Sequence, residues 1–463
     1  MRPSLKKTLL VVLAFGLCWG GAIWYWRATN RMPATADLVI YLLVLPVLLL
    51  LLIWLGAKLV GLIGAAPVAA AVAAPAAAAD TPSAAPAAPA LAIIGSALRL
   101  PHGASPEELS EALQENKARA DLDPQLQDDQ GYPIMTARSE HADGSSVQEA
   151  LDEWLVAQRL PPLELDEEQW RALTMGSAVA NELASQAASL LIPAEGTPAT
   201  LRLMPMLPPG WKMEQRRVAG LWLRHVVEQA GWPAAHIALA AELPADARGA
   251  TPAAVLGRLA HHASSADAAT AAMIVACGSH LGEASVNQWN DNATLFTATR
   301  PQGLIPGEGA AGLLLADLRQ IAALEIAPPV LLHLVDEARR HNSADDAKRA
   351  DADLLGNLTE KVLARAQSKA DEVVMVVADT GHRTSRVLEL MGLAAAALPQ
   401  LDETADVLRV GAASGTCGAV PFMAALALAR HHALERAAPI LCISNEDAYR
   451  RCAALIRPAA SLS

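Results

Sequence analysis

A cysteine in a glycine-rich turn is the residue of this sequence best placed for covalent chemistry. Cys417 lies in segment 410–420, which follows an apolar run beginning near Val407 and leads into an alanine-rich, helical run from Pro421 to Ala429. The unpaired N–H groups at the start of a helix stabilise a thiolate, so Cys417 is a candidate nucleophile. The alternative is that the glycines let two layers touch and that Cys417 is a small buried apolar residue, which is the commoner state of a free cysteine.

The other cysteines and the histidines do not form a disulfide or zinc pattern. The chain has five cysteines, an odd number, and no two of them form a CxxC pair. Two histidine pairs stand out, at 261–262 and at 431–432, but neighbouring residues on a helix point about 100° apart and do not chelate one ion together. We therefore expect both pairs on solvated helix faces, and the sequence predicts no metal and no cofactor.

Composition limits the classes of partner. The formal charge is −12 and there is no lysine or arginine run, whereas a protein that neutralises phosphates needs a basic face. Nucleic acid is therefore excluded as a partner. The chain of 463 residues is 53% hydrophobic but only 4% aromatic, which favours closely packed helices with small side chains.

The N-terminal region is predicted to cross a membrane twice. Thr8 to Trp26 and Leu38 to Ala57 are uncharged stretches of nineteen and twenty residues, each long enough to span the hydrocarbon layer. A cleaved signal peptide is the competing interpretation, and the second span argues against it. Residues 1–64 are thus expected to form a two-span hairpin, and the basic residues near the N-terminus favour both termini in the cytoplasm.

A spacer separates this anchor from the body. Residues 65–90 are nearly all alanine and proline, and the prolines prevent a continuous helix, which predicts a semi-extended linker. The body, residues 91–463, alternates apolar strand patterns with helical patterns. Strands are expected at 91–100, 201–207, 237–240 and 272–279, and this alternation predicts an α/β fold with a largely buried sheet.

Three segments of the body resemble the β-ketoacyl synthases of the thiolase superfamily. The first, Ala92 to Leu113, combines an apolar strand with a helix that starts at Ser105 and Pro106, and the second is the run Gly303 to Ala311 before a strand. The third comprises the two strand–turn–helix units that begin at 373 and 407. The resemblance implies a duplicated α/β/α layered fold and a homodimer; residues 121–200 show little family signal.

The resemblance also implies where reactive residues should stand. A ketosynthase uses a cysteine at a helix start and two histidines. The matched positions here hold Thr251, Ala378 and Ala412, so the catalytic set is predicted to be lost. Glu308 matches a glutamate that is chiefly a structural partner in the family, and we expect a buried, hydrogen-bonded carboxylate rather than a general base. A displaced site would have to use His382 together with Cys417.

These expectations favour a non-catalytic protein. It would serve as a scaffold or interaction module in a multi-protein assembly, such as a secretion system, at the inner membrane of a bacterium, with its large C-terminal domain in the cytoplasm. The second hypothesis is a membrane-associated acyltransferase or condensing enzyme, or a protein that binds an acyl carrier protein or an acyl chain. The third is a lipid sensor that binds acyl chains in the substrate tunnel without turnover.

Overall fold

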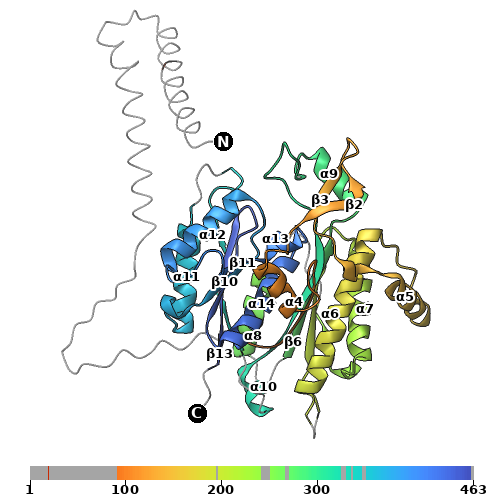
Figure 1. The fold of residues 1–463 in the computed structure, drawn as a ribbon. Coiled ribbons are helices and arrows are strands. Elements are labelled where there is room, and N and C mark those ends of the chain that lie inside the picture. The colour runs from red at the N-terminus through yellow and green to blue at the C-terminus, as the bar shows by residue number, and fades with distance from the viewer. Residues whose placement is uncertain are drawn as a thin grey trace, which may run out of the picture. The chain divides into compact units, whose positions relative to one another are not determined.

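The computed structural model describes the body of the chain with short gaps (Figure 1). The described residues are Trp19, 91–193, 197–240, 251–265, 271–324, 330–334, 337–346 and 351–459. Apart from Trp19, the predicted membrane hairpin and the predicted linker lie outside them. Within these residues, no helix has both the length and the apolar character needed to cross a membrane.

The strands of the body form two halves with the same topology. The first half has the order β1-β7-β6-β4-β5, and the second has the order β8-β13-β12-β10-β11. In each half the first two pairings are antiparallel and the last two are parallel. The strands are β1 (Leu91–Arg99), β4 (Leu201–Met206), β5 (Ile237–Leu239), β6 (Ala271–Ser279), β7 (Glu308–Ala316), β8 (Val330–Leu334), β10 (Met375–Ala378), β11 (Val407–Arg409), β12 (Ile440–Ser444) and β13 (Arg450–Pro458). The predicted duplicated α/β architecture is confirmed.

The antiparallel pairing of β1 with β8 joins the halves into one continuous sheet, and helices cover its outer and inner faces. The outer side of the first half is covered by α6 (Glu167–Leu191) and α7 (Met213–Gln229), and that of the second by α11 (Asp353–Ala366) and α12 (Thr384–Ala397). Between the halves lie α8 (Pro252–Ser265) and α14 (Val420–Arg436), whose side chains share one core with the inner faces of both (Figure 1). The remaining elements are α4 (Pro106–Gln114), β2 (Asp121–Gln127), β3 (Pro133–Thr136), η2 (Glu140–Ala142), α5 (Ser145–Ala157), η3 (Ala234–His236), α9 (Glu283–Asp291), α10 (Leu318–Ala323), β9 (Ala338–Arg339), η4 (Ala370–Glu372) and α13 (Val410–Ser414).

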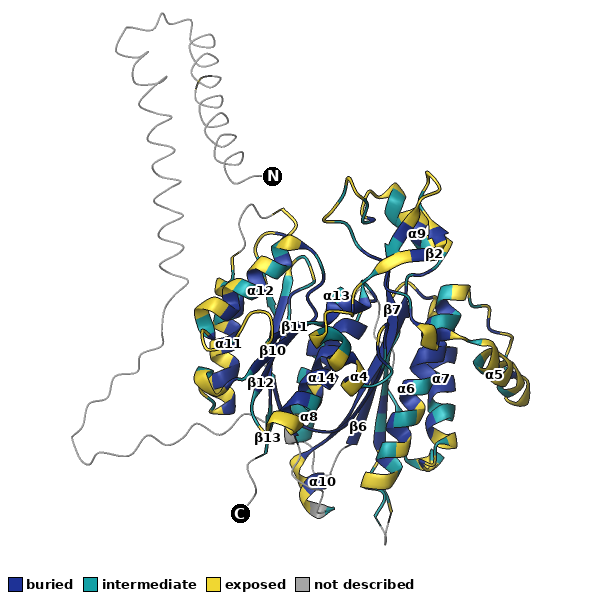
Figure 2. Ribbon diagram, in the orientation of Figure 1, coloured by how far each residue is buried: buried dark blue, intermediate teal, exposed yellow. Residues whose placement is uncertain are grey.

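The central helix α14 is buried on nearly every side. Its first ten residues are all buried, and they are apolar all round rather than along one stripe (Figure 2). Five of those ten residues are alanine or proline, so both halves of the sheet can approach the helix closely. By contrast, α5 and α11 show exposed outer sides in the same view.

The predicted start of α4 is confirmed. A cap also begins α6, the long helix in residues 121–200, where the sequence shows little family signal. Ser105 Oγ accepts a hydrogen bond from Glu108 N at 3.3 Å, and Pro106 occupies the first turn. In 121–200, α6 starts at a capping box in which Asp166 and Gln169 satisfy each other's backbone N–H groups.

The glycine-rich segment differs from the prediction in one respect. A short helix, α13, occupies part of what was expected to be a simple turn after β11. The glycines do let layers touch: Thr416 N donates to Ile305 O at 2.8 Å, and Gly307 packs against the backbone of Ser414 and Gly415. A Cβ atom on Gly307 would overlap Ser414 O and would lie 2.8 Å from Gly415 Cα.

This close approach predicts that Gly307→Ala destabilises the protein. The added methyl group meets backbone that cannot move aside, and the expected loss is about 1–3 kcal/mol. Gly356→Ala is the matched control, because a Cβ there has no heavy atom within 4 Å and the exchange within α11 should stabilise by about 0.5–1 kcal/mol. Chemical denaturation of the full chain in detergent measures both; equal stability of the two variants would contradict the packing described.

Candidate functional site

A cleft lies where strand ends from both halves meet the start of the two central helices. Its volume is about 1270 Å³. The strand ends contribute Ser279 of β6, Asp379 after β10 and Ser444 of β12, and the helix starts contribute Thr251 before α8 and Cys417 before α14. Ligands commonly bind at the carboxyl ends of strands in α/β proteins, so this cleft is the candidate site.

Cys417 lies at the cleft but its thiol is not activated. The residue is 1% exposed, and Sγ donates to the carbonyl oxygen of Ser414 at 3.6 Å. Burial raises the pKa of the thiol well above its ordinary value. Cys277, which also lines the cleft, is buried in the same way, and burial raises its pKa to about 12. Both cysteines therefore have the character of small core residues.

Thr251 has a structural task at the start of α8. Its Oγ1 accepts a hydrogen bond from Ala254 N at 3.2 Å, which caps the helix. The hydroxyl is thus held at the place where the resemblance implies a nucleophile. Among the described residues, no basic side chain forms a hydrogen bond with this hydroxyl. A hydroxyl without such a base is a poor acyl acceptor.

The two alanines at the matched histidine positions do not line the described part of the cleft. Ala378 is buried at the end of β10, and the next residue, Asp379, is the one that reaches the cleft. Ala412 lies within α13. The residue that β10 presents to the cleft is therefore the carboxylic acid Asp379.

Asp379 is the most strongly perturbed acid of the cleft. It is 6% exposed; Oδ2 accepts from Ser444 Oγ at 2.5 Å, and Oδ1 accepts from Asn445 N at 2.8 Å and Glu446 N at 3.1 Å. Burial raises its pKa to about 6, although the hydrogen bonds oppose that change. A carboxyl group that ionises near pH 6 can exchange protons under physiological conditions.

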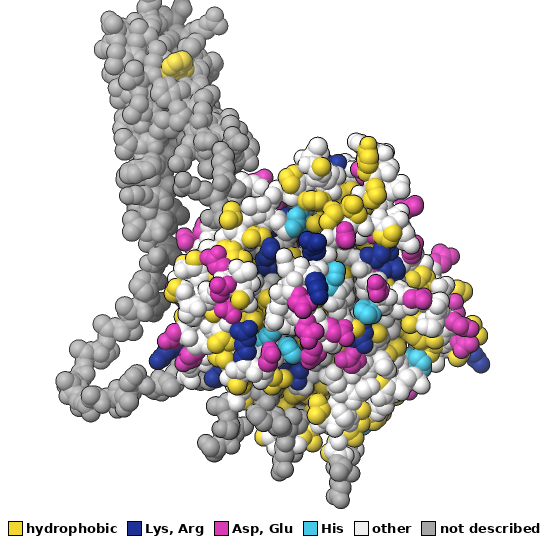
Figure 3. All heavy atoms as spheres, in the orientation of Figure 1, with side chains coloured by type: hydrophobic (Ala, Val, Ile, Leu, Met, Phe, Trp, Pro, Cys, Tyr) yellow, Lys and Arg dark blue, Asp and Glu magenta, His cyan; other side chains and the backbone are white. Residues whose placement is uncertain are grey.

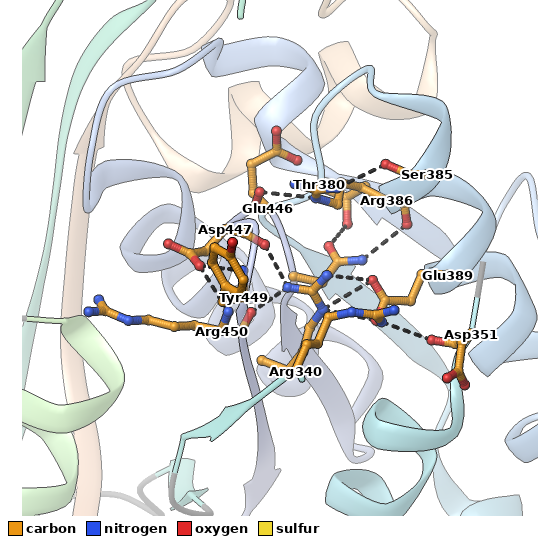
Figure 4. A network of polar contacts seen from close by, with 12 residues as sticks. Arg340, Asp351, Thr380, Ser385, Arg386, Glu389, Glu446, Asp447, Tyr449 and Arg450 are labelled. Atoms are coloured by element: carbon orange, nitrogen blue, oxygen red, sulfur yellow. Dashed lines mark hydrogen bonds and ion pairs between the residues drawn. The ribbon is translucent and has the colours of Figure 1, made fainter. Parts of the chain in front are cut away.

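Two arginines at the start of α12 are not solvated, although the sequence alone predicts solvated arginines at an exposed helix start. Arg383 donates from Nε to Glu446 Oε1 at 2.9 Å, and Arg386, which is fully buried, donates to Asp345 Oδ1 at 2.7 Å and to Glu446 O at 3.2 Å. Figure 4 shows Arg386 and Glu446 lying close together. The loop after β12 and the start of α12 are thereby fixed to each other.

Glu389 forms a second, buried part of the same network. Its carboxylate accepts from Arg451 Nη2 at 2.8 Å and from Arg340 Nη1 at 2.6 Å, and Figure 4 shows Arg340 directed at it. Arg451 and Glu389 are both almost fully enclosed. Such a pair holds β13 to α12, because removing one member leaves a buried charge.

His382 does not meet Cys417 in a common site. It does not line the described cleft, its ring lies edge-on to Phe296 at 5.1 Å between centroids, and burial lowers its pKa. Its Nε2 has no hydrogen-bond partner among the residues that the structure describes. The described cleft lining includes a different histidine, His280, whose pKa burial lowers to about 4.

Glu308 is a fully buried carboxylate with several donors. It accepts from Ser139 N at 2.7 Å, from Arg171 Nε at 2.8 Å and from Ser279 Oγ at 3.1 Å. These contacts tie β7 to α6 and to the segment before η2. This is the structural environment that the sequence led us to expect for Glu308.

We predict that Asp379→Asn changes how stability depends on pH. Folding raises the pKa of Asp379 from near 4 to about 6, so its neutral form contributes stability that is full below pH 4 and is lost as pH rises through 6. Asparagine keeps the shape without ionising. The variant should therefore gain stability relative to wild type between pH 4 and 7, by on the order of 2 kcal/mol. Thermal unfolding across this range measures it; a pH-independent difference would contradict the raised pKa.

Comparison with known proteins identifies the fold. No protein-family model and no curated protein matches the sequence. Among solved structures, the chain is similar to the ketosynthase from module 6 of the bacillaene synthase of Bacillus subtilis 168, with TM-score 0.54 and 12% identity over 81% of this chain and 73% of that chain. It is also similar to the ketosynthase from module 1 of the bacillaene synthase of Bacillus amyloliquefaciens FZB42 (TM-score 0.53, 13% identity, 80% and 72%) and to an oxazolomycin ketosynthase domain of Streptomyces albus JA3453 (TM-score 0.53, 11% identity, 81% and 75%). The body therefore has the thiolase-like ketosynthase fold.

Proposed function

We propose that this chain, with its ketosynthase fold, is a non-catalytic interaction module held at a membrane. The observation that carries the proposal is the state of Cys417: it is the thiol nearest to a helix start at the cleft, yet it is enclosed and its pKa is raised. An acyl-transferring cysteine needs the opposite, a stabilised thiolate beside a base.

The surroundings of Cys417 support the same conclusion. Thr251 is engaged in capping α8, and His382 packs against Phe296 away from the described cleft lining. Glu308 is held by three donors from the protein itself. Thr251 and Glu308 are therefore engaged in holding the fold, and His382 does not lie beside Cys417 in the described cleft.

The cleft supports a second function, binding without turnover. At about 1270 Å³ it has room for an acyl chain, and its described lining combines apolar residues such as Met206 and Phe422 with the polar groups of Asp379 and Arg383. We propose an acyl chain, alone or on an acyl carrier protein, as the occupant, and a homodimer as the assembled state. Nucleic acid does not fit, because acidic and basic side chains are interspersed on the face in Figure 3 and the net charge is −12.

Labelling with an acyl-thioester probe at neutral pH distinguishes this proposal from the acyltransferase hypothesis. We expect no acylation of Cys417 in the full-length protein, because a buried thiol with a raised pKa supplies almost no thiolate. Thr251→Cys is the matched variant, since it places a thiol at the start of α8, and it should become labelled. Mass spectrometry locates the adduct.

Labelling of the wild type that disappears in Cys417→Ala would overturn the non-catalytic proposal. The Thr251→Cys protein shows in the same experiment that the probe reaches the cleft. Lipid that co-purifies with the wild type and is identified by mass spectrometry would favour the binding function.

The proposed membrane anchor rests on the two uncharged stretches within residues 1–64. We expect the full chain in the membrane fraction of a bacterial cell and a chain lacking residues 1–64 in the soluble fraction. Alkaline extraction followed by flotation measures this. If the anchored protein serves an inner-membrane assembly, the shortened chain should also fail to restore its cellular function, and full restoration would contradict the anchored scaffold.

A further inference from the structure

A group of metal-ligating side chains lies on the C-terminal part of α14, where this helix meets α4. His431, His432 and Glu435 each offer one ligand atom, and these atoms all lie within 4.8 Å of one another. Glu435 Oε2 is 3.0 Å from His432 Nδ1 and 3.9 Å from His431 Nε2. One carboxylate therefore lies within reach of both imidazoles.

The second histidine is built into the protein, not solvated as its position beside His431 led us to expect. The side chain of His432 is fully buried, and its Nε2 lies 3.0 Å from Ser110 Oγ on α4. Gln114 Nε2 in turn donates to that hydroxyl at 3.2 Å. A histidine that ligates a metal through one ring nitrogen usually has its other nitrogen fixed by such a partner.

A second carboxylate approaches from α4. Glu107 Oε1 lies 3.1 Å from His431 Nδ1, and the two imidazole rings have centroids 5.1 Å apart at 65° to each other. Adjacent histidines on an isolated helix diverge, but here the turn of the helix places Glu435 between them. Donors around a tetrahedral zinc ion are roughly 3.4 Å apart, as follows from bonds of about 2.1 Å. Small rotations of the exposed Glu435 and the half-buried His431 reach that spacing.

We propose that His431, His432 and Glu435 bind one divalent transition-metal ion such as Zn²⁺, with Glu107 holding the other ring nitrogen of His431 as Ser110 holds that of His432. Two imidazoles and carboxylate oxygens are a donor set that suits zinc and its neighbours in the first transition row. Glu435 as a ligand, and Glu107 on the far side of the His431 ring, balance the charge of the ion. Because Glu107 and Ser110 belong to α4, the ion would join α4 to the central helix and stabilise the folded body.

Metal titration of the full chain tests the site. Untagged protein in detergent, stripped with a chelator, is titrated with Zn²⁺ in calorimetry and with Co²⁺ in visible absorption, where a low-symmetry nitrogen–oxygen site gives ligand-field bands. We expect one equivalent to bind and to raise the thermal midpoint. His431→Ala and Glu435→Gln each alter a side chain that is not fully buried, so both variants should fold, and each should weaken binding by about tenfold or more.

His141→Ala is the matched control, because His141 is an exposed histidine of another element and its loss should leave the affinity unchanged. The proposal is overturned if the wild type shows no saturable binding of one equivalent. It is also overturned if His431→Ala and Glu435→Gln bind Zn²⁺ as tightly as the wild type does.

Discussion

The whole body depends on a central layer of helices that the two halves of the sheet share. Side chains of α8 and α14 fill one continuous core with the inner faces of both halves. A change in the packing of one inner face therefore also affects the packing of the other. Glycines at 307 and 415 and the alanines of α14 make the short distances possible. The same packing that holds the halves together also encloses Cys417, because its turn is the point where the layers touch.

The chemistry of the cleft follows from this enclosure. The buried charged side chains around it are satisfied by ion pairs: Glu308 at the start of β7 by Arg171, and Glu389 and Arg386 of α12 by Arg451 and Asp345. Asp379 differs, because its donors are a hydroxyl and two backbone N–H groups rather than a cation. No cation pairs with it among the described hydrogen bonds and ion pairs, so burial raises its pKa to about 6 in spite of these donors.

Much of the fold could be predicted from the sequence, because strands buried on both faces and a capped helix such as Ser105–Gln114 have local signals. The contacts between residues that are distant in sequence could not be predicted. The burial of Arg383 and Arg386 depends on Glu446 and Asp345, which are distant in sequence, and the burial of His432 depends on α4, more than three hundred residues earlier. The position of Asp379 at the cleft, one residue after the end of β10, also could not be predicted, because it depends on how the strand ends of both halves are arranged. The loss of the catalytic set stays a prediction.

The repeated strand order has a consequence for how such a protein could arise. A chain of half this length, with one sheet and one inner helix, would leave an apolar side of that helix in water. It could be stable only by pairing with a second copy of itself, through the surface that α8 and α14 now occupy. Joining the two copies in one polypeptide makes that association permanent and independent of concentration. It also frees each copy to change its residues at the shared cleft separately, so that one helix start carries Thr251 and the other Cys417.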